Sequence, residues 1–308
     1  MEKKNCSIIY NPVTSGFKQK KLDEVCKTLD KKYEVEARKS EAPGHAIELA
    51  RQSNLDSDLV ISYGGDGTFG ELIQGIYNEN QQALLSHIPI GTANDLRRNF
   101  GLQKNPAKSA ELIRDGEEQK LDIFTLNDIP FSYVAAFGYL ANVPCNTPTK
   151  LKKYLKYAAY LVKALEEFKN KKPYEYDMTL MYDGKTIDEK AIVGTFTNST
   201  GFGGMNLFTD VSLDDDKFEV TFVKNMDKSR MPKIALDIFS DPITHNFDLR
   251  NYPDVITHFQ TSELTIKFNN KEPEEFIDLD GDPMNVSTGD GVYRLKKGRS
   301  INIQLPRR

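Results

Sequence analysis

The chain has 308 residues, enough for two domains, and its formal net charge is −4. Hydrophobic residues make up 39% and charged residues 28%, so the chain can bury a core and still keep a solvated surface. The slight acidic excess argues against a dedicated nucleic-acid-binding protein, which is usually strongly basic. The three cysteines are widely spaced, which suggests neither a zinc site nor a disulfide framework and favours reduced thiols.

No segment of the sequence has the character of a leader or a membrane span. The apolar run Ile8–Tyr10 is too short for a signal peptide, and no window approaches the ~18–20 apolar residues of a membrane-spanning helix. We therefore expect a cytoplasmic protein without a transmembrane segment. If the protein works on lipid, it must meet that lipid at the bilayer surface.

Residues 1–126 alternate short apolar strands with segments whose apolar residues recur at helical spacing. This alternation predicts a parallel sheet covered by helices on both faces. In chain order we predict strands at 8–10, 33–37, 59–63 and 87–90, and helices at 19–31, 44–54 and 68–77.

From residue 127 onward the strand-like runs meet at turn dipeptides, and we predict a mostly β domain through residue 308. Asp183-Gly184, between two such runs, is typical of a β-hairpin. The last strand is free to pack back on the first domain. The other predicted elements are strands at 179–182, 186–187, 191–197, 218–223, 264–268 and 300–305, and a helix at 150–169.

A glycine-rich turn, Gly64–Thr68, stands where the third predicted strand gives way to a helix. Ligands of open α/β sheets bind at the carboxyl ends of strands, and a helix N-terminus offers N–H groups to phosphate. Glycines there allow positive φ and a close approach to the ligand, and Thr68 can cap the helix or donate to phosphate. Because the Asp66 carboxylate repels phosphate unless Mg²⁺ lies between them, the turn indicates nucleotide and Mg²⁺.

A tight turn with an aspartate cap is the plain alternative for Gly64–Thr68. The spacing fits neither the P-loop nor the G-x-G-x-x-G dinucleotide motif. The next strand, however, runs into a second turn of similar composition, Gly91–Asp95. Glycine, threonine and aspartate thus recur at neighbouring strand ends, which favours a ligand site over an isolated turn.

The motifs GGDGT at 64–68 and IP-x-GT-x-ND at 88–95 together resemble the diacylglycerol kinase catalytic-domain family. That family includes soluble bacterial lipid kinases and is related to sphingosine and ceramide kinases. GGDGT alone also resembles NAD kinases and phosphofructokinases, whereas the ordered set of motifs is specific. The other similar segments are Asn11-Pro12 with Ser15-Gly16 (NP-x-SG in the family), 120–123 (VDIG), 213–215 (LDDG) and 280–282 (DGE).

The resemblance implies an α/β + β fold. A three-layer α/β nucleotide-binding domain, similar to NAD kinases and phosphofructokinases, would occupy 1–126, and a mostly β, sandwich-like lipid-kinase domain 127–308. The implied function is an ATP- and Mg²⁺-dependent transfer of the γ-phosphoryl group to the primary hydroxyl of a membrane lipid. Diacylglycerol is the expected acceptor and phosphatidic acid the product; a homodimer is left open.

The resemblance also implies roles for individual residues. Asp66, Asp95 and Asp122 would form a carboxylate cluster that holds the catalytic Mg²⁺, partly through water. Asp282 would orient the lipid hydroxyl and accept its proton. A structural Mg²⁺ would lie at Ser212, Asp215 and Lys217, where a solvated acidic turn is an equal alternative. The expected ATP-binding residues are Asn11, Ser15, Gly16, Ser40, Gly65, Asp66, Gly67, Thr68, Glu71 and Thr92.

Three positions depart from the family pattern. The loop 11–16 is one residue longer than NP-x-SG, and Asp216 replaces the glycine of LDDG. Asp282 stands where the family has glutamate, and one methylene less retracts the carboxylate by about 1 Å, given C–C bonds of about 1.5 Å. A misplacement of about 1 Å can cost about 10²-fold in rate. Asp280-Gly281 is also a common turn pair, so a plain β-turn remains the alternative for this segment.

The segment 150–172 combines an apolar helical face with lysines and tyrosines, so it could rest on anionic lipid or simply cover the β domain. Two other functions remain open for the whole chain. One is a kinase of another small molecule, similar to NAD kinases. The other is a regulator that binds nucleotide or lipid and has weak or lost activity, which the shorter Asp282 encourages.

Overall fold

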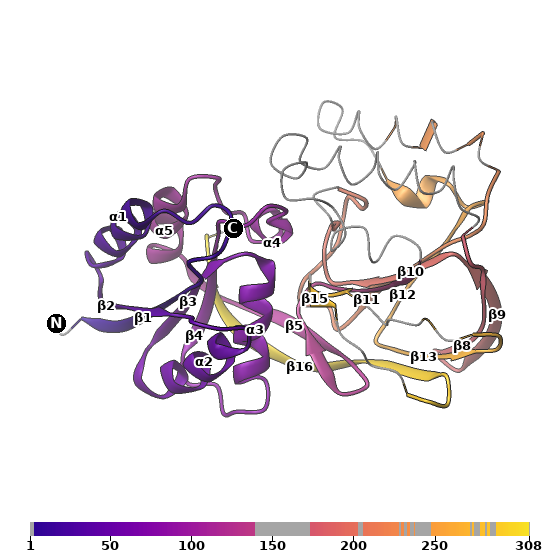
Figure 1. Cartoon of the computed structure of the whole chain (residues 1–308), viewed down its shortest axis with the longest axis horizontal. Helices are drawn as coiled ribbons and strands as arrows, with labels where there is room; N and C mark the ends of the chain where they lie inside the picture. Colours follow the sequence, from indigo (N-terminus) through magenta and orange to yellow (C-terminus); the bar gives the residue numbers. More distant parts are fainter. Residues whose placement is uncertain are drawn as a thin grey trace. The chain divides into compact units, whose positions relative to one another are not determined.

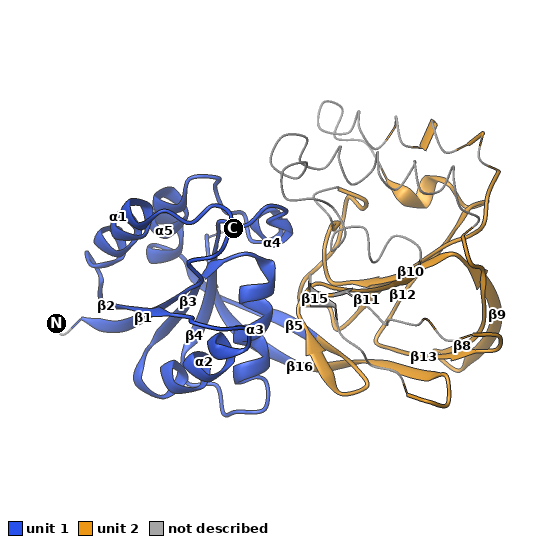
Figure 2. Cartoon of the chain, viewed as in Figure 1, with its two compact units in different colours: residues 1–123, 299–308 blue, residues 124–298 orange. Residues whose placement is uncertain are grey.

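A computed structural model gives the structure of the chain (Figure 1). It divides into two compact units, Met1–Ile123 with Arg299–Arg308 as unit 1 and Phe124–Gly298 as unit 2 (Figure 2). The helix predicted at 150–169 lies outside the described residues. The structure describes residues 3–138, 173–202, 206–227, 229–230, 233–234, 237, 248–271, 273, 278–280, 282–283 and 288–307.

Unit 1 is built on a parallel sheet whose strand order is β2-β1-β3-β4. The strands β3 and β4 are apolar and buried almost throughout, as expected for a parallel sheet that is covered on both faces. The end of β16 joins the same sheet, where Ile303 pairs parallel with Leu85. The bounds are β1 Lys4–Tyr10, β2 Tyr33–Lys39, β3 Leu59–Gly64, β4 Leu84–Pro89 and β16 Val292–Leu305.

Two helix pairs cover this sheet. Helices α1 and α5 pack together on one face, and α2 and α3 pack together on the other (Figure 1). The fold of unit 1 is therefore the expected three-layer α/β arrangement. The bounds are α1 Gln19–Leu29, α2 His45–Asp56, α3 Asp66–Ile76, α4 Asp95–Asn99 and α5 Pro106–Arg114.

Unit 2 consists mainly of two antiparallel sheets, as the expected β sandwich requires. One has the order β12-β11-β10-β7-β14-β15, and the other contains β13, β8 and β9 beside the first part of β16. Phe137 of β7 packs on Phe196 and Phe222 of its own sheet and on Tyr176 and Phe268 of the other, so aromatic rings fill the space between the sheets. The bounds are β7 Val134–Gly138, β8 Tyr176–Tyr182, β9 Lys185–Ala191, β10 Val193–Thr197, β11 Phe218–Val223, β12 Ile256–Thr261, β13 Glu263–Phe268, β14 Asp278–Leu279 and β15 Asp282–Pro283.

The remaining elements are short or lie at the boundary between the units. Strand β5 (Glu117–Leu126) begins in unit 1 and ends in unit 2, where it pairs with β6 (Ile129–Phe131). The short 3-10 helix η1 spans Leu249–Asn251. The predicted hairpin at Asp183-Gly184 is confirmed: both residues have positive φ, 48° and 70°, as a type I′ turn requires.

Arg299 and Ser300, in the C-terminal segment of unit 1, bind the C-terminal end of α3 and Asp122 of β5. Arg299 donates to the backbone carbonyls of Ile76 and Glu79 at the C-terminal end of α3, with distances of 3.0 and 2.6 Å. A cation at this end of a helix is favourable because the last carbonyls are left without helical partners. The next residue, Ser300, donates to the Asp122 carboxylate at 2.7 Å. The C-terminal segment therefore supports α3, the helix that begins at the first glycine-rich turn.

Candidate active site

The two glycine-rich turns of unit 1 lie against each other at the carboxyl ends of β3 and β4. The Ile90 N–H donates to the Gly64 carbonyl at 2.8 Å, which joins the turns at their bases. A Cβ atom placed on Gly91 would stand 2.8 Å from the Cα of Gly65. The sequence motifs at 64–68 and 91–95 thus form one continuous backbone surface.

The sequence suggested that these glycines adopt positive φ. The structure shows instead that they allow the backbone to pack closely. Gly65 has φ −86°, and none of Gly64, Gly67 and Gly91 has a positive φ. A Cβ on Gly64 would come within 2.3 Å of the Thr68 hydroxyl oxygen. The residue with positive φ is instead Asn94, at 54°.

Gly91→Ala tests this packing. The added methyl would meet the backbone of Gly65 inside van der Waals contact, so we expect a destabilisation of about 1–3 kcal/mol, as for other overpacked sites. Gly65→Ala is the matched control, because its Cβ would meet only the Gly91 Cα at 3.8 Å. Urea unfolding of both variants measures the difference. Equal stability of the two variants would contradict the packing argument.

Helix α3 begins directly in the first turn, with Gly65 as its N-cap and Asp66 as its first residue. Thr68 lies inside the first helical turn, where its N–H donates to the Gly65 carbonyl at 3.0 Å. The suggestion that Thr68 caps the helix was therefore wrong, since no side chain makes a cap hydrogen bond here. The helix N-terminus itself points at the turn, as phosphate binding requires.

Asp66 links the two turns through its carboxylate. Its Oδ2 accepts the backbone N–H of Asp95 at 3.1 Å, and its Oδ1 faces the N–H of Leu96 at 3.4 Å. These are the first N–H groups of α4, so Asp66 caps a second helix while it opens α3. Arg98 donates to the Asp95 carboxylate at 3.2 Å. The Asp66 carboxylate therefore contacts the backbone of Asp95, while the Asp95 carboxylate binds Arg98.

Asp122 lies on β5 of unit 1, is buried, and accepts a hydrogen bond from Ser300. Within the described part of the chain, no group of three or more histidine, cysteine, aspartate or glutamate side chains is arranged to hold a metal ion. Mg²⁺, however, is commonly bound through one or two carboxylates, with water and substrate phosphates as its other ligands. Asp66 and Asp95, the first residues of the adjoining helices α3 and α4, can supply the one or two carboxylates of that kind of site.

A buried histidine lies beneath this site. His87 of β4 is fully buried, and its Nδ1 lies 2.6 Å from the hydroxyl oxygen of Ser62 on β3. Its Nε2 lies 3.8 Å from Oδ1 of Asp66. Burial lowers the pKa of His87 to about 3, so the imidazole is neutral at physiological pH. Neither Ser62 nor His87 belongs to a sequence motif described above.

The N-terminal loop at 11–16 reaches the same strand ends. Asn11 donates its N–H to the Tyr63 carbonyl at 3.3 Å, and its side chain accepts the N–H of Val13 at 3.1 Å. The hydroxyls of Ser15 and Thr92 are 3.2 Å apart, which joins this loop to the second glycine-rich turn. Four of the predicted ATP-binding residues, Asn11, Ser15, Gly16 and Thr92, thus gather at one edge of the sheet.

Ser40 and Glu71, also predicted to bind ATP, have contacts that organise the backbone. The Ser40 N–H donates to the Tyr10 carbonyl at 2.9 Å. The Glu71 carboxylate accepts the N–H groups of Gly44 and Ala46, at 3.4 and 3.2 Å, at the start of α2. Glu71 of α3 therefore caps the N-terminus of α2. Because the two lie far apart along the chain, no local sequence pattern indicates this cap.

Unit 2 contains the segment with Asp282. Asp282 opens β15, and Leu279 of β14 pairs with it in the antiparallel pair β14–β15. The side chain of Asp282 lies outside the described part of the structure. Asp282 therefore stands at the start of β15, paired with Leu279 of β14.

Asp280 anchors this segment, a role that the sequence did not indicate. Its carboxylate accepts the N–H groups of Ser132, Tyr133 and Val134 and the Ser132 hydroxyl, at 2.6–3.1 Å. Burial raises the pKa of Asp280, and these four donors oppose that rise. Asp280 has φ 55°, in the left-handed region that aspartate tolerates better than most residues. The carboxylate thereby ties the β14–β15 pair to the start of β7.

The segment expected to hold a structural Mg²⁺ is an exposed turn in unit 2. The Asp215 carboxylate accepts the Lys217 N–H at 3.1 Å, and the Ser212 hydroxyl donates to Asp214 at 2.9 Å. Asp216, which replaces the family glycine, has φ 63° and forms an ion pair with Lys297 at 2.6 Å. The turn therefore tolerates the replacement by holding aspartate in the left-handed conformation.

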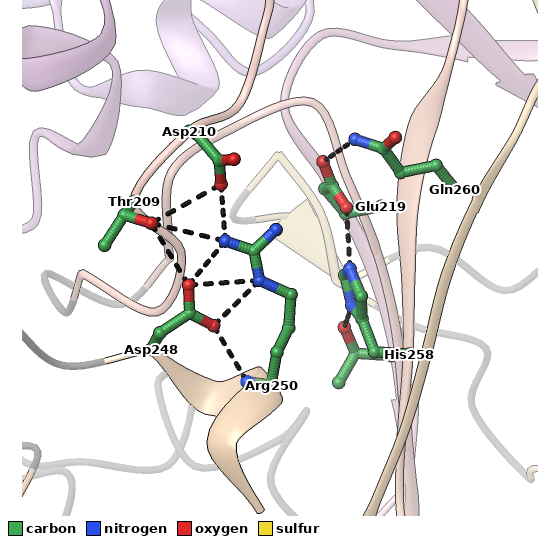
Figure 3. A network of polar contacts seen from close by, with 8 residues as sticks. Thr209, Asp210, Glu219, Asp248, Arg250, His258 and Gln260 are labelled. Atoms are coloured by element: carbon green, nitrogen blue, oxygen red, sulfur yellow. Dashed lines mark hydrogen bonds and ion pairs between the residues drawn. The ribbon is translucent and has the colours of Figure 1, made fainter. Parts of the chain in front are cut away.

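Two further polar clusters of unit 2 are fully assembled from side chains (Figure 3). Arg250 binds the carboxylates of Asp248 and Asp210, which fastens η1 to the loop before β11. Burial raises the pKa of Asp248, but Arg250 outweighs it and holds that pKa below its usual range. On the neighbouring strands, His258 Nε2 lies 2.9 Å from the buried Glu219 carboxylate (Figure 3).

The architecture combines a three-layer α/β unit, which carries two joined glycine-rich turns, with a β-sandwich unit. This combination defines the class of the protein. The diacylglycerol kinase catalytic-domain profile matches residues 5–126. Over 239 residues the chain is 32% identical to the diacylglycerol kinase of Bacillus subtilis (strain 168), which covers 75% of this chain and 78% of that protein. The diacylglycerol kinase of Staphylococcus aureus (strain JH9) is also 32% identical, over 75% of this chain and 74% of that protein. The chain belongs to the diacylglycerol kinase family and is a lipid kinase.

Solved structures show the same fold. A crystal structure of a diacylglycerol kinase from Bacillus anthracis str. Sterne has a TM-score of 0.73 at 18% identity, covering 99% of this chain and 98% of that one. Another solved chain from the same organism has a TM-score of 0.78 at 21% identity, covering 98% and 97%. Among the described residues, no helix is both long enough and apolar enough to cross a bilayer.

Proposed function

We propose that this chain transfers the γ-phosphoryl group of ATP to the primary hydroxyl of diacylglycerol, in the presence of Mg²⁺, and so forms phosphatidic acid. The observation that carries the proposal is the joining of the two glycine-rich turns by Asp66. Asp66 opens α3 and its side chain caps α4, so the N-termini of both helices meet at the ends of β3 and β4, and the first residue of each helix is an aspartate.

The residues at these strand ends suit nucleotide phosphates. The backbone N–H groups of the first turn of α3 can bind anionic oxygens, and the close packing of Gly64, Gly65 and Gly91 brings the two turns together at that helix N-terminus. Ser15 and Thr92 add hydroxyl donors from the two flanking loops. Mg²⁺, when bound at Asp66 and Asp95, neutralises the charge that develops on the transferred phosphoryl group. Asp122, which Ser300 orients, completes the proposed carboxylate set.

The acceptor hydroxyl needs a base in the same reaction. We assign this task to Asp282, the first residue of β15, in the segment that Asp280 anchors. A carboxylate in that role orients the hydroxyl and takes its proton as the bond to phosphorus forms. The acceptor is a membrane lipid, which the protein would meet at the bilayer surface as a peripheral protein. The structural Mg²⁺ proposed at Ser212, Asp215 and Lys217 would support unit 2 and take no part in the transfer.

An acceptor panel tests the proposal. The purified chain is incubated with γ-labelled ATP, Mg²⁺ and mixed micelles that contain diacylglycerol, monoacylglycerol, sphingosine or ceramide, with NAD as a water-soluble acceptor. We expect label in diacylglycerol above all other acceptors. Label in NAD would replace the proposal by an NAD-kinase activity. Label in sphingosine or ceramide alone would leave a lipid kinase but overturn the acceptor.

A further inference from the structure

The centre of the unit 1 sheet contains a polar pair where apolar side chains are the rule. Ser62 and His87 lie opposite each other on the parallel strands β3 and β4, and both are fully buried. Buried parallel strands are usually almost wholly apolar, because an imidazole removed from water without hydrogen bonds is costly. The pair also lies directly beneath the two glycine-rich turns, since β3 and β4 end there.

The contacts of His87 favour one of its two neutral tautomers. In a neutral imidazole one nitrogen donates and the other accepts. Nδ1 lies 2.6 Å from the Ser62 hydroxyl, and Nε2 faces Oδ1 of Asp66 at 3.8 Å. A carboxylate only accepts, so the favourable arrangement has the hydrogen on Nε2 and the Ser62 hydroxyl donating to Nδ1. The opposite tautomer would direct a lone pair at the carboxylate.

The ring has little freedom to leave this orientation. Phe69 packs against it with ring centroids 5.4 Å apart, and Ser62 holds the opposite edge. Nε2 has no hydrogen-bond partner among the described residues, and the Asp66 carboxylate faces it at 3.8 Å. At 3.8 Å the contact is a charge–dipole attraction and not a hydrogen bond, and the surrounding apolar core strengthens it.

We propose that His87 is a positioning residue, which holds the Asp66 carboxylate in place by presenting its Nε2–H to Oδ1. The Asp66 carboxylate accepts N–H groups from the start of α4, and its Oδ1 also faces His87, so the imidazole adds a second constraint on the position of that oxygen. Partners of this kind, behind a metal-binding carboxylate, typically change metal affinity or activity about 10–100-fold when they are removed. The inference rests on the proposed function, because it assigns Asp66 to Mg²⁺ and phosphate.

Three substitutions of His87 separate this role from simple packing. Glutamine can place an N–H near the position of Nε2, whereas asparagine reaches only the position of Nδ1, and leucine fills the space without any N–H. The affinity for ATP is measured by calorimetry at a series of Mg²⁺ concentrations, alongside kcat, KM for the lipid, and Tm. We expect His87→Asn and His87→Leu to need about tenfold more Mg²⁺ for the same ATP affinity, and His87→Gln to stay within about threefold of wild type.

The calorimetric measurement distinguishes a failure of the proposed function from a failure of the role proposed for His87. If the wild-type chain binds ATP with Mg²⁺ but phosphorylates no lipid, the proposed function fails, and the ranking of the three variants still decides the role of His87. Folded asparagine and leucine variants with the wild-type Mg²⁺ requirement would overturn the positioning role. So would an equal loss in all three variants that follows their Tm, since that marks His87 as a packing residue.

Discussion

Asp282→Asn is expected to lower kcat by about 10³-fold, within the range of about 10²–10⁴ that a general base contributes. The amide keeps the size of the carboxylate but cannot take the proton of the lipid hydroxyl. Affinity for ATP should change less than about twofold, because the proposed nucleotide residues all belong to unit 1 and Asp282 belongs to unit 2. Steady-state rates with diacylglycerol micelles and calorimetry with ATP measure the two quantities.

Two companion variants make this result interpretable. Asp290→Asn changes an exposed aspartate of the same unit and should leave kcat unchanged within about twofold. Asp282→Glu restores the side chain that the family has at this position. A faster Asp282→Glu enzyme would show that the shorter carboxylate limits the reaction, and an unchanged rate would show that the β14–β15 pair compensates for it. An Asp282→Asn enzyme with wild-type kcat would remove Asp282 from the mechanism.

Asp280→Ala is expected to destabilise unit 2 by about 3–5 kcal/mol, because several buried donors lose their common acceptor at once. The substitution removes the acceptor of the N–H groups of Ser132, Tyr133 and Val134 and of the Ser132 hydroxyl. Each buried donor that loses its acceptor costs about 1–3 kcal/mol. Urea unfolding measures the total, and hydrogen exchange of the amides at 132–134 reports the local loss.

Asp290→Ala is the control for stability, because this exposed carboxylate also accepts a backbone N–H, that of Val292 at 3.0 Å. In water such a bond contributes only about 0.5–1.5 kcal/mol. A cost below about 1 kcal/mol for Asp280→Ala, or unchanged exchange at 132–134, would mean that the β14–β15 pair is held by something else.

The sequence predicted the layout of unit 1 because the relevant signals are local. Buried parallel strands give apolar runs, and the glycines after β3 and β4 interrupt them at fixed points. Placing Gly64–Thr68 beside Gly91–Asp95 followed from one rule, that parallel strands end on the same edge of their sheet. The close fit of Gly65 against Gly91 depends on the distance between two strands, which no local pattern records.

The positions that the sequence missed depend on partners far along the chain. Asp280 binds backbone 146–148 residues away, and Ser300 reaches Asp122 across 178 residues. Ser62 and His87 looked like ordinary strand residues because their pairing requires the register of β3 and β4. The start of α5 is one that the sequence could have predicted. Asn105 followed by Pro106 is a typical helix start, and Asn105 does accept the N–H groups of Ala107 and Lys108.

The most direct test of the central claim is the identity of the product. Wild-type protein, ATP, Mg²⁺ and diacylglycerol micelles should give phosphatidic acid and ADP in equal amounts, measured by mass spectrometry and a coupled ADP assay. Both products should disappear when EDTA removes Mg²⁺. Binding of ATP without phosphate transfer to diacylglycerol or any other acceptor in the panel would contradict the account and identify a regulator in place of a kinase.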